Sequence, residues 1–235
     1  MMTFTLLGYG PGDGLEDISP FCLKVVNYLR WTNTDYELEI TDPRRTPRGK
    51  LPCLIYGEEV VPDSSGIIHY LETRHAIRLD DHLSAQEHAQ GRIIQSVFEE
   101  HLYFILIYWR WTDQIGWSHY KAHLLRYFDD IGVPSLLQEA GAWSARKSVQ
   151  QNIWGQGVGR MDREAVHGKG VEILQSLSTL LDDRAFFVGN EPNSYDACAY
   201  AFLASIIRPH IPSPLQTSVR HFDNLVGYCE RMRKL

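Results

Sequence analysis

The stretch Ser19-Pro20-Phe21-Cys22 constrains the fold most, because it joins a strand-like apolar run, Phe4 to Tyr9, to a helical pattern that begins at Leu23. A small hydroxyl residue followed by proline starts a helix, since serine can cap free amides and proline loses no needed N–H at the first helical position. The positive end of such a helix favours a thiolate, phosphate or carboxylate in front of it. We therefore predict anion chemistry at this helix start.

Length and charge exclude several classes of protein. The chain has 235 residues, enough for two unequal domains, and a net charge of −6 with only short basic clusters, so we expect no nucleic-acid binding. The N-terminus lacks the pattern of a signal peptide, and the most apolar run, Leu102 to Trp109, is far shorter than the ~20 residues of a membrane-spanning helix. These features predict a cytoplasmic protein without a membrane span.

The four cysteines, Cys22, Cys53, Cys198 and Cys229, show neither Cys-x-x-Cys pairing nor the Cys/His spacing of a zinc site. The ten histidines show no spacing typical of metal ligands or of a catalytic triad. We therefore expect free thiols in a reducing compartment, and we predict no metal.

The first third of the chain alternates strand and helix patterns. A helical pattern over 20–31 lies between strand patterns over 4–8 and 36–40, which indicates a right-handed parallel unit. Leu51 to Tyr56 then predicts a strand whose second residue, Pro52, marks an edge or a cis bond. A turn at Gly57-Glu58, a short strand and a capped helix after Asp63 complete the order β-α-β-β-α.

Two motifs in this order resemble those of glutathione transferases. Gly49-Lys50-Leu51-Pro52-Cys53-Leu54 is similar to their strand-opening motif with its cis proline. Residues 63–71 are similar to their (Glu/Asp)-Ser-x-x-Ile-x-x-Tyr-Leu motif. The resemblance implies an α/β thioredoxin-like N-terminal domain, about residues 1–80, that binds glutathione.

Beyond residue 80 the pattern changes to long helices, and polar residues 80–84 predict a domain boundary. We expect an all-α C-terminal domain over 84–235, beginning with a helix from Ser84 to about Gly116. The aromatic residues of that helix include Tyr103, Trp109 and Trp111. Such a stripe is typical of helical core, and it is also a candidate hydrophobic substrate site beside the first domain.

Later motifs narrow the resemblance. Gly157-Val158-Gly159-Arg160, a helix ending at residue 181, and Phe186 to Ala197 with a capping Asn193 follow in order. With Ser-Pro-Phe-Cys at the front, they resemble the branch of the glutathione transferase superfamily related to failed-axon-connections proteins and metaxins, in a soluble form. The match covers nearly the whole chain.

Ser19 is the first candidate for catalysis. The resemblance implies that the glutathione sulfur lies over this helix start, where a serine hydroxyl and amides would lower a thiol pKa from about 8.5 toward neutrality. The local pattern alone favours a plain helix cap. Cys22 is an alternative reactive thiol or a small buried residue, and Tyr9 is a third candidate near the end of the first strand.

The resemblance also assigns binding roles to the two motifs. It implies that Leu51, before the cis Pro52, pairs its main chain with the cysteinyl group of glutathione. Asp63 and Ser64 would hold the γ-glutamyl amine and carboxylate, although both are also typical of a helix cap. Among the basic loop residues, Lys50 is the candidate for the glycyl carboxylate.

The resemblance implies a glutathione transferase that conjugates glutathione to a small hydrophobic electrophile and forms a homodimer, and we expect no metal. Two alternatives remain open. One is a noncatalytic binding or protein-interaction module with the same fold, since fold does not imply function. The other is a glutathione-dependent thiol reductase that acts through Cys22. Oxygen at Ser19 leaves no dithiol for disulfide exchange by the pair.

Overall fold

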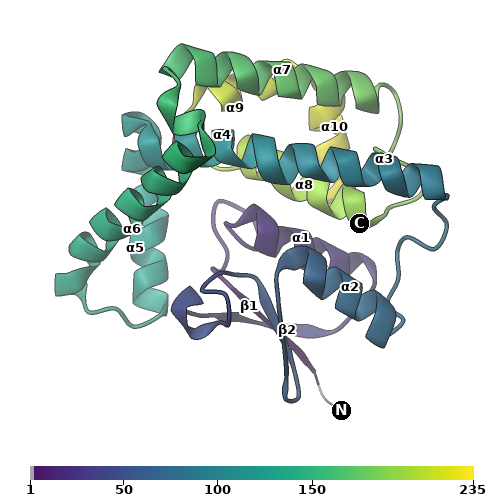
Figure 1. Cartoon of the computed structure of the whole chain (residues 1–235), viewed down its shortest axis with the longest axis horizontal. Helices are drawn as coiled ribbons and strands as arrows, with labels where there is room; N and C mark the ends of the chain where they lie inside the picture. The colour runs from purple at the N-terminus through teal and green to yellow at the C-terminus, as the bar shows by residue number, and fades with distance from the viewer. Residues whose placement is uncertain (1–2) are drawn as a thin grey trace.

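The computed structural model describes residues 3–235, which form a sheet layer and a helical layer (Figure 1). Four strands form one mixed sheet in the order β2-β1-β3-β4. β1 and β2 are parallel, and β3 is antiparallel to both β1 and β4. The strands are β1 (Phe4–Gly8), β2 (Tyr36–Ile40), β3 (Cys53–Tyr56) and β4 (Glu59–Pro62). The predicted strand order and the parallel first unit are confirmed.

Helix α1 (Pro20–Trp31) lies between the two layers and is buried nearly all round. Its residues Leu23, Val25 and Leu29 have no exposed surface. A helix that is apolar on several faces needs partners on more than one side. Figure 1 shows the sheet on one side of α1 and α8 (Ser194–Ile207) on the other, with α2 (Ser64–Arg74) beside it. The start of α1 is thereby held where the two layers meet.

The remaining chain is helical, and the predicted combination of a thioredoxin-like part with a helical part is confirmed. The change from strands to helices follows the end of α2. The helices are α3 (Ala85–Ser96), η2 (Val97–Leu102), α4 (Tyr103–Ile107), η3 (Tyr108–Thr112), α5 (Gln114–Asp130), α6 (Ser135–Gln156), α7 (Arg163–Leu181), α9 (Pro214–Val219) and α10 (Asp223–Met232), with short turns η1 (Pro43–Arg45) and η4 (Val158–Arg160). None of the helices in the described residues is long and apolar enough to cross a membrane.

The single helix predicted from Ser84 to about Gly116 is wrong at its far end. The chain leaves the helix at Asp113, whose carboxylate accepts hydrogen bonds from the amides of Ile115 and Gly116, at 3.1 and 3.0 Å, and so starts α5. A Cβ at Gly116 would lie 1.7 Å from the carbonyl oxygen of Trp109. Only glycine therefore fits this sharp junction.

Helix α8 forms the centre of the helical layer. The predicted cap at its start is confirmed, because the Asn193 side chain accepts from the amides of Tyr195 and Asp196, both at 3.1 Å. The buried Asp196 carboxylate accepts from the Phe187 amide at 3.0 Å and from the Tyr228 hydroxyl at 2.9 Å. Burial raises the pKa of Asp196 to about 7. These contacts hold the connection before α8 against α10.

Candidate functional site

Ser19 stands at the cap position of α1, with Pro20 in the first turn. Within residues 3–235 its side chain makes no capping hydrogen bond to the helix, so the expected capping by the hydroxyl is not seen. Ser19 is partly exposed, whereas its neighbours Ile18 and Pro20 are buried. A partly exposed hydroxyl that does not cap the amides of its own helix can donate to an anion in front of α1.

Asp17 holds the loop before α1 and was not found by sequence reasoning. Its carboxylate is completely buried and accepts from the amides of Tyr9, Gly10 and Ser19 at 2.9, 3.0 and 2.8 Å. Burial raises its pKa to about 7, against the opposing effect of these three donors. The sequence signal for this role was an acidic residue two positions before the predicted helix cap. Asp17 ties the end of β1 to the start of α1.

Cys22 lies in the first turn of α1 and has no exposed surface. Burial and the nearby Asp17 carboxylate raise the pKa of the thiol well above its ordinary value, and hydrogen bonding to Ser19 opposes the shift. A thiol is nucleophilic only as a thiolate, and it must also be reachable. The geometry therefore supports the interpretation of Cys22 as a buried packing residue.

The predicted cis bond is present between Leu51 and Pro52, just before β3. In the antiparallel pair, Leu7 of β1 lies opposite Cys53 of β3, which brings the end of β1 beside Leu51. Leu7, Cys22, Leu51 and Cys53 form one small apolar cluster, with Tyr9 packed against it. The cis bond thus lies at the end of the sheet where β1 ends and β3 begins, next to the start of α1.

Asp63 adopts a left-handed backbone with a φ of 77°, which is uncommon for a residue other than glycine. Its Oδ1 caps α2 by accepting from the amides of Ser65 and Gly66, at 3.0 and 3.1 Å. Its own amide donates to the Pro52 carbonyl at 3.3 Å, which joins the two motifs. Oδ2 takes no part in these bonds and can face a ligand ammonium.

The other two predicted binding residues differ in exposure. Ser64, in the first turn of α2, is buried with 3% of its surface exposed. The Lys50 side chain is exposed, while its amide and carbonyl both bond to the Thr46 hydroxyl. We call Ser19, Leu51, Pro52, Asp63 and Ser64 the α/β wall. Its polar groups are mainly amides, carbonyls and small side chains, and Lys50 lies at its margin.

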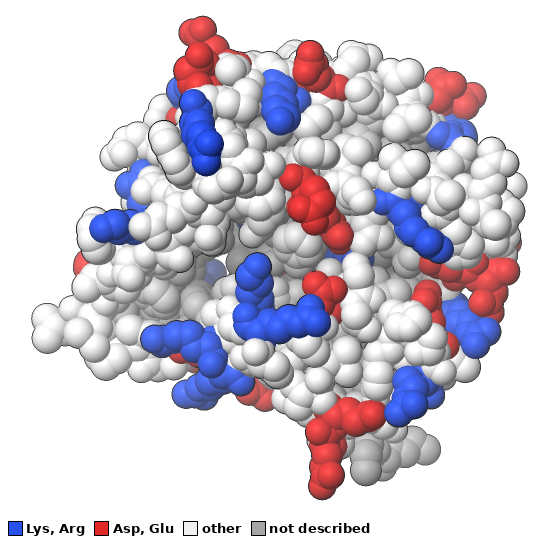
Figure 2. Space-filling model, in the orientation of Figure 1, with Lys and Arg blue, Asp and Glu red and all other residues white. Residues whose placement is uncertain are grey.

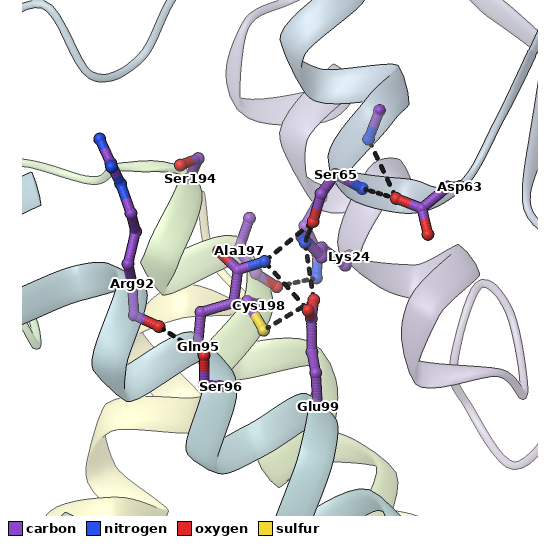
Figure 3. A network of polar contacts seen from close by, with 12 residues as sticks. Lys24, Asp63, Ser65, Arg92, Gln95, Ser96, Glu99, Ser194, Ala197 and Cys198 are labelled. Atoms are coloured by element: carbon purple, nitrogen blue, oxygen red, sulfur yellow. Dashed lines mark hydrogen bonds and ion pairs between the residues drawn. The ribbon is translucent and has the colours of Figure 1, made fainter. Parts of the chain in front are cut away.

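A partly buried polar network connects the α/β wall to the helical layer (Figure 3). The Lys24 ammonium on α1 donates to Ser65 Oγ on α2 at 2.8 Å and to Glu99 Oε1 on η2 at 2.7 Å. Gln95 on α3 donates to the same two partners, and the Cys198 thiol lies 3.7 Å from Glu99 Oε1. Helices α1, α2 and α3 therefore meet at Ser65, directly beside the motif residue Ser64, and Glu99 links them to η2 and α8.

The predicted hydrophobic site residues fall into two groups. Trp109 and Trp111 are buried, at 1% and 9% exposure, so they serve the helical core and not a substrate wall. The Arg163 guanidinium covers the Trp109 ring at 5.0 Å. Tyr103 is partly exposed, and its ring meets Phe21 of α1 edge-on at 4.9 Å. Tyr103 remains a candidate, because it lies beside the first turn of α1.

A second wall consists of Tyr9, Tyr103 and Tyr120 with Arg110, and we call it the tyrosine wall. The sequence analysis named Tyr9 and Tyr103 as separate candidates and missed Tyr120 and Arg110. All three tyrosines are partly exposed, and burial raises their pKa values, so their hydroxyls remain protonated donors. These groups, with Cys22, are near enough to shift one another's pKa.

Arg110 gives this wall a buried positive charge. The guanidinium donates to the carbonyls of Ile18, at 3.1 Å, and Ser205, at 2.7 Å, and lies 5.4 Å from the Tyr120 ring centre. Only 3% of the residue is exposed. Because Ile18 precedes Ser19, Arg110 both holds the start of α1 and places positive charge near it. Figure 2 shows a hollow left of centre, beside the place where α1 begins in Figure 1.

The comparisons with known proteins agree with this geometry. Residues 20–116 match the glutathione S-transferase N-terminal domain, and residues 170–232 match the C-terminal domain. The chain is 35% identical to the isoprene-epoxide glutathione S-transferase of Rhodococcus sp. strain AD45, over 98% of each chain. The chain belongs to the glutathione S-transferase family. The first matched range includes the residues around both Pro52 and Asp63.

The chain is also similar to proteins that are not named as transferases. It is 29% identical to Failed axon connections of Drosophila melanogaster, over 93% of this chain and 54% of that protein. It is 28% identical to metaxin-1 of Sus scrofa, over 98% and 74%. The predicted resemblance to this branch is confirmed. FzlA from C. crescentus, with a TM-score of 0.63 at 14% identity over 99% of this chain and 88% of that chain, shares the fold.

The chain has a cleft of about 770 Å³ between α2 and α3. Lys24, Ser65 and Gln95 line it, so part of the polar network faces this cleft. Its lining includes neither Ser19 nor Leu51 nor Asp63. The cleft is thus distinct from the α/β wall.

Proposed function

We propose that this chain is a glutathione transferase that adds the glutathione thiolate to a small hydrophobic electrophile. The observation that carries the proposal is the Ser19 hydroxyl, partly exposed at the start of α1 beside the cis Leu51–Pro52 bond. The hydroxyl and the first amides of α1 donate to the sulfur and favour the thiolate. The buried Arg110 charge nearby favours an anion further.

Binding of the peptide rests on the α/β wall. The main chain at Leu51 pairs with the cysteinyl unit in an extended arrangement, and Oδ2 of Asp63 accepts from the γ-glutamyl ammonium. The γ-glutamyl carboxylate lies at the start of α2, where the Ser64 amide and the helix dipole favour negative charge. The exposed Lys50 ammonium meets the glycyl carboxylate.

The electrophile contacts the tyrosine wall, and an epoxide is its first candidate class, by analogy with the Rhodococcus relative. Sulfur attack forms a C–S bond and breaks one C–O bond of the ring, and the electron pair of that bond remains on the oxygen. The alkoxide then takes a proton from a neutral hydroxyl such as that of Tyr120, and water restores it. Arg110 stabilises the negative charge in between.

Calorimetric titration with reduced glutathione tests the binding step. We expect saturable binding that weakens in Asp63→Asn, because the asparagine oxygen can still cap α2 but carries no charge for the ammonium. Asp63→Ala, which loses both the cap and the charge, should also lower the stability. Absence of binding in the wild-type chain would contradict the proposal.

A noncatalytic binding module is the second candidate function, since the chain also resembles Failed axon connections and metaxin-1. The loop before α1 is held by the helical layer through Asp13, whose carboxylate contacts His123 at 3.1 Å and the His210 amide at 3.2 Å. Glutathione binding without consumption of its thiol in the presence of epoxides would favour this function.

A further inference from the structure

The loop that precedes the α/β wall is built around one side chain, that of Thr46. This loop, residues 41–50, connects β2 to the motif at Leu51 and contains η1. Figure 1 shows it between the sheet and α5, where the Tyr127 hydroxyl donates to the Thr41 carbonyl at 2.7 Å. Thr46 is only 7% exposed, whereas residues 47–50 are all exposed. A buried hydroxyl needs hydrogen-bond partners, and Thr46 finds them in the loop itself.

The Thr46 hydroxyl bonds to both main-chain groups of Lys50. Its Oγ1 accepts from the Lys50 amide at 3.2 Å, and its single proton is shared between the carbonyls of Lys50, at 2.9 Å, and Pro43, at 2.8 Å. The Thr46 carbonyl accepts from the Gly49 amide at 3.1 Å. Within residues 3–235, no other side chain forms a hydrogen bond with the main chain of residues 47–50. The path of the chain into Leu51 therefore depends on this one hydroxyl.

The main chain of Leu51 has no hydrogen-bond partner. Only 7% of the residue is exposed, and neither its amide nor its carbonyl forms a hydrogen bond within residues 3–235. Leu7 lies opposite Cys53 in the pair of β1 and β3, and this register continues to Tyr9 opposite Leu51. The Tyr9 amide, however, donates to Asp17 at 2.9 Å. Because a buried, unpaired amide costs free energy, the Leu51 amide favours a ligand that can accept from it.

The planar peptide unit between Lys50 and Leu51 joins these two observations. The Lys50 carbonyl and the Leu51 amide belong to this one unit, and in a trans peptide the C=O and N–H groups point in opposite directions. The Lys50 carbonyl is held toward Thr46, so the Leu51 N–H is held pointing away from Thr46. Any rotation of the unit would turn both groups together, and it would break the bond to the hydroxyl.

We propose that Thr46 is a positioning residue for glutathione, which acts through the peptide unit between Lys50 and Leu51. The inference rests on the proposed function, in which the cysteinyl main chain of glutathione pairs with Leu51. The Thr46 bonds fix the direction of the Leu51 N–H before glutathione arrives, so binding costs less conformational entropy. Because Thr46 acts through the main chain and not on the sulfur, its loss weakens glutathione binding and leaves the chemical step unchanged.

Thr46→Val tests the role in binding, because it removes the hydroxyl and keeps the branched shape. Thr46→Ser, which keeps the hydroxyl, is the matched control and should bind like the wild type. We expect the calorimetric Kd and the KM for glutathione to rise about fivefold to tenfold in Thr46→Val. The kcat at saturating glutathione should change by less than about twofold.

Two results of this test overturn the inference alone. One is an equal Kd in Thr46→Val and the wild type, and the other is a fall in kcat as large as the rise in KM. Absence of glutathione binding in the wild type contradicts the proposed function as well.

Limited digestion with trypsin tests the Thr46 bonds without glutathione. Lys50 is exposed, but trypsin cuts after it only when the peptide unit between Lys50 and Leu51 opens locally. We expect the fragment that ends at Lys50, identified by mass spectrometry, to form about fivefold to tenfold faster in Thr46→Val than in the wild type or Thr46→Ser. Equal rates in the three proteins would show that the hydroxyl does not hold this unit, and would overturn the inference.

Discussion

The α/β wall and the tyrosine wall approach the start of α1 by different physical means. The α/β wall presents main-chain groups, one hydroxyl and one carboxylate, all within short local motifs. The tyrosine wall presents three phenols and a buried guanidinium that come from the loop after β1, η3, α4 and α5. Local motifs position the backbone groups of the α/β wall through nearby residues. The side chains of the tyrosine wall come together only when the sheet layer packs against the helical layer.

The largest expected effect comes from breaking the network that joins the two layers. Lys24→Met leaves the Glu99 carboxylate without a cation in a largely buried site, so we expect a loss of about 3–5 kcal/mol in the free energy of unfolding. Urea denaturation measures this loss. The double variant Lys24→Met/Glu99→Leu should regain much of it, because no unpaired charge remains. A loss below about 1 kcal/mol in the single variant would show that solvent screens the pair.

Ser19→Ala tests the α/β wall itself. Loss of a hydrogen bond to a charged group corresponds to about 1.5–3 kcal/mol, so kcat/KM should fall by about 10-fold to 100-fold. Glutathione affinity should change little, since Asp63 and the main chain remain. Consumption of free thiol measures the rate, and Ser19→Thr, which keeps a hydroxyl, is the matched control. An unchanged rate in Ser19→Ala, with loss of activity in Cys22→Ala, would favour the thiol reductase instead.

The pH dependence of stability tests Asp17, which holds the loop before α1. The pKa of Asp17 is about 7 when folded, and that of an unfolded aspartate is about 3.9. The folded chain therefore holds an extra proton between these values, and its stability falls as the pH rises from about 4 through 7.

Between pH 6 and pH 8 this group contributes a fall of roughly 1 kcal/mol in the free energy of unfolding. Asp196 has the same raised pKa and should contribute a similar fall. Urea denaturation at several pH values should show a shallower dependence in Asp17→Asn than in the wild type. If the free energy of unfolding depends equally on pH in the two proteins, a group other than Asp17 binds the extra proton.

The smallest effect is expected at the tyrosine wall. Tyr120→Phe removes one neutral donor, worth about 0.5–1.5 kcal/mol, so kcat/KM with an epoxide should fall by roughly twofold to tenfold. Acceptors that develop no oxyanion should react as before. Trp109→Phe is the matched comparison: this buried substitution should lower stability without changing the preference among acceptors. An equal loss with both kinds of acceptor would argue against proton donation by Tyr120.

Much of the fold could be predicted because its signals are local. The Ser19-Pro20 helix start, the cis bond at Pro52 and the caps at Asp63 and Asn193 each depend on a few neighbouring residues. Such signals survive in the sequence because capping and proline geometry act within one turn. The family followed from their order along the chain.

The sequence by itself determined the α/β wall, since the motifs around Ser19, Pro52 and Asp63 place backbone groups through local geometry. Only the tertiary structure decided which aromatic residues reach the site. Trp109 and Trp111 share a helical stripe with Tyr103, yet the chain turns at Asp113 and buries both tryptophans. Packing of α5 against η3 brings Tyr120 beside Arg110 instead. Periodicity tells which side chains share a face, and the neighbouring elements determine whether that face meets the core or a ligand.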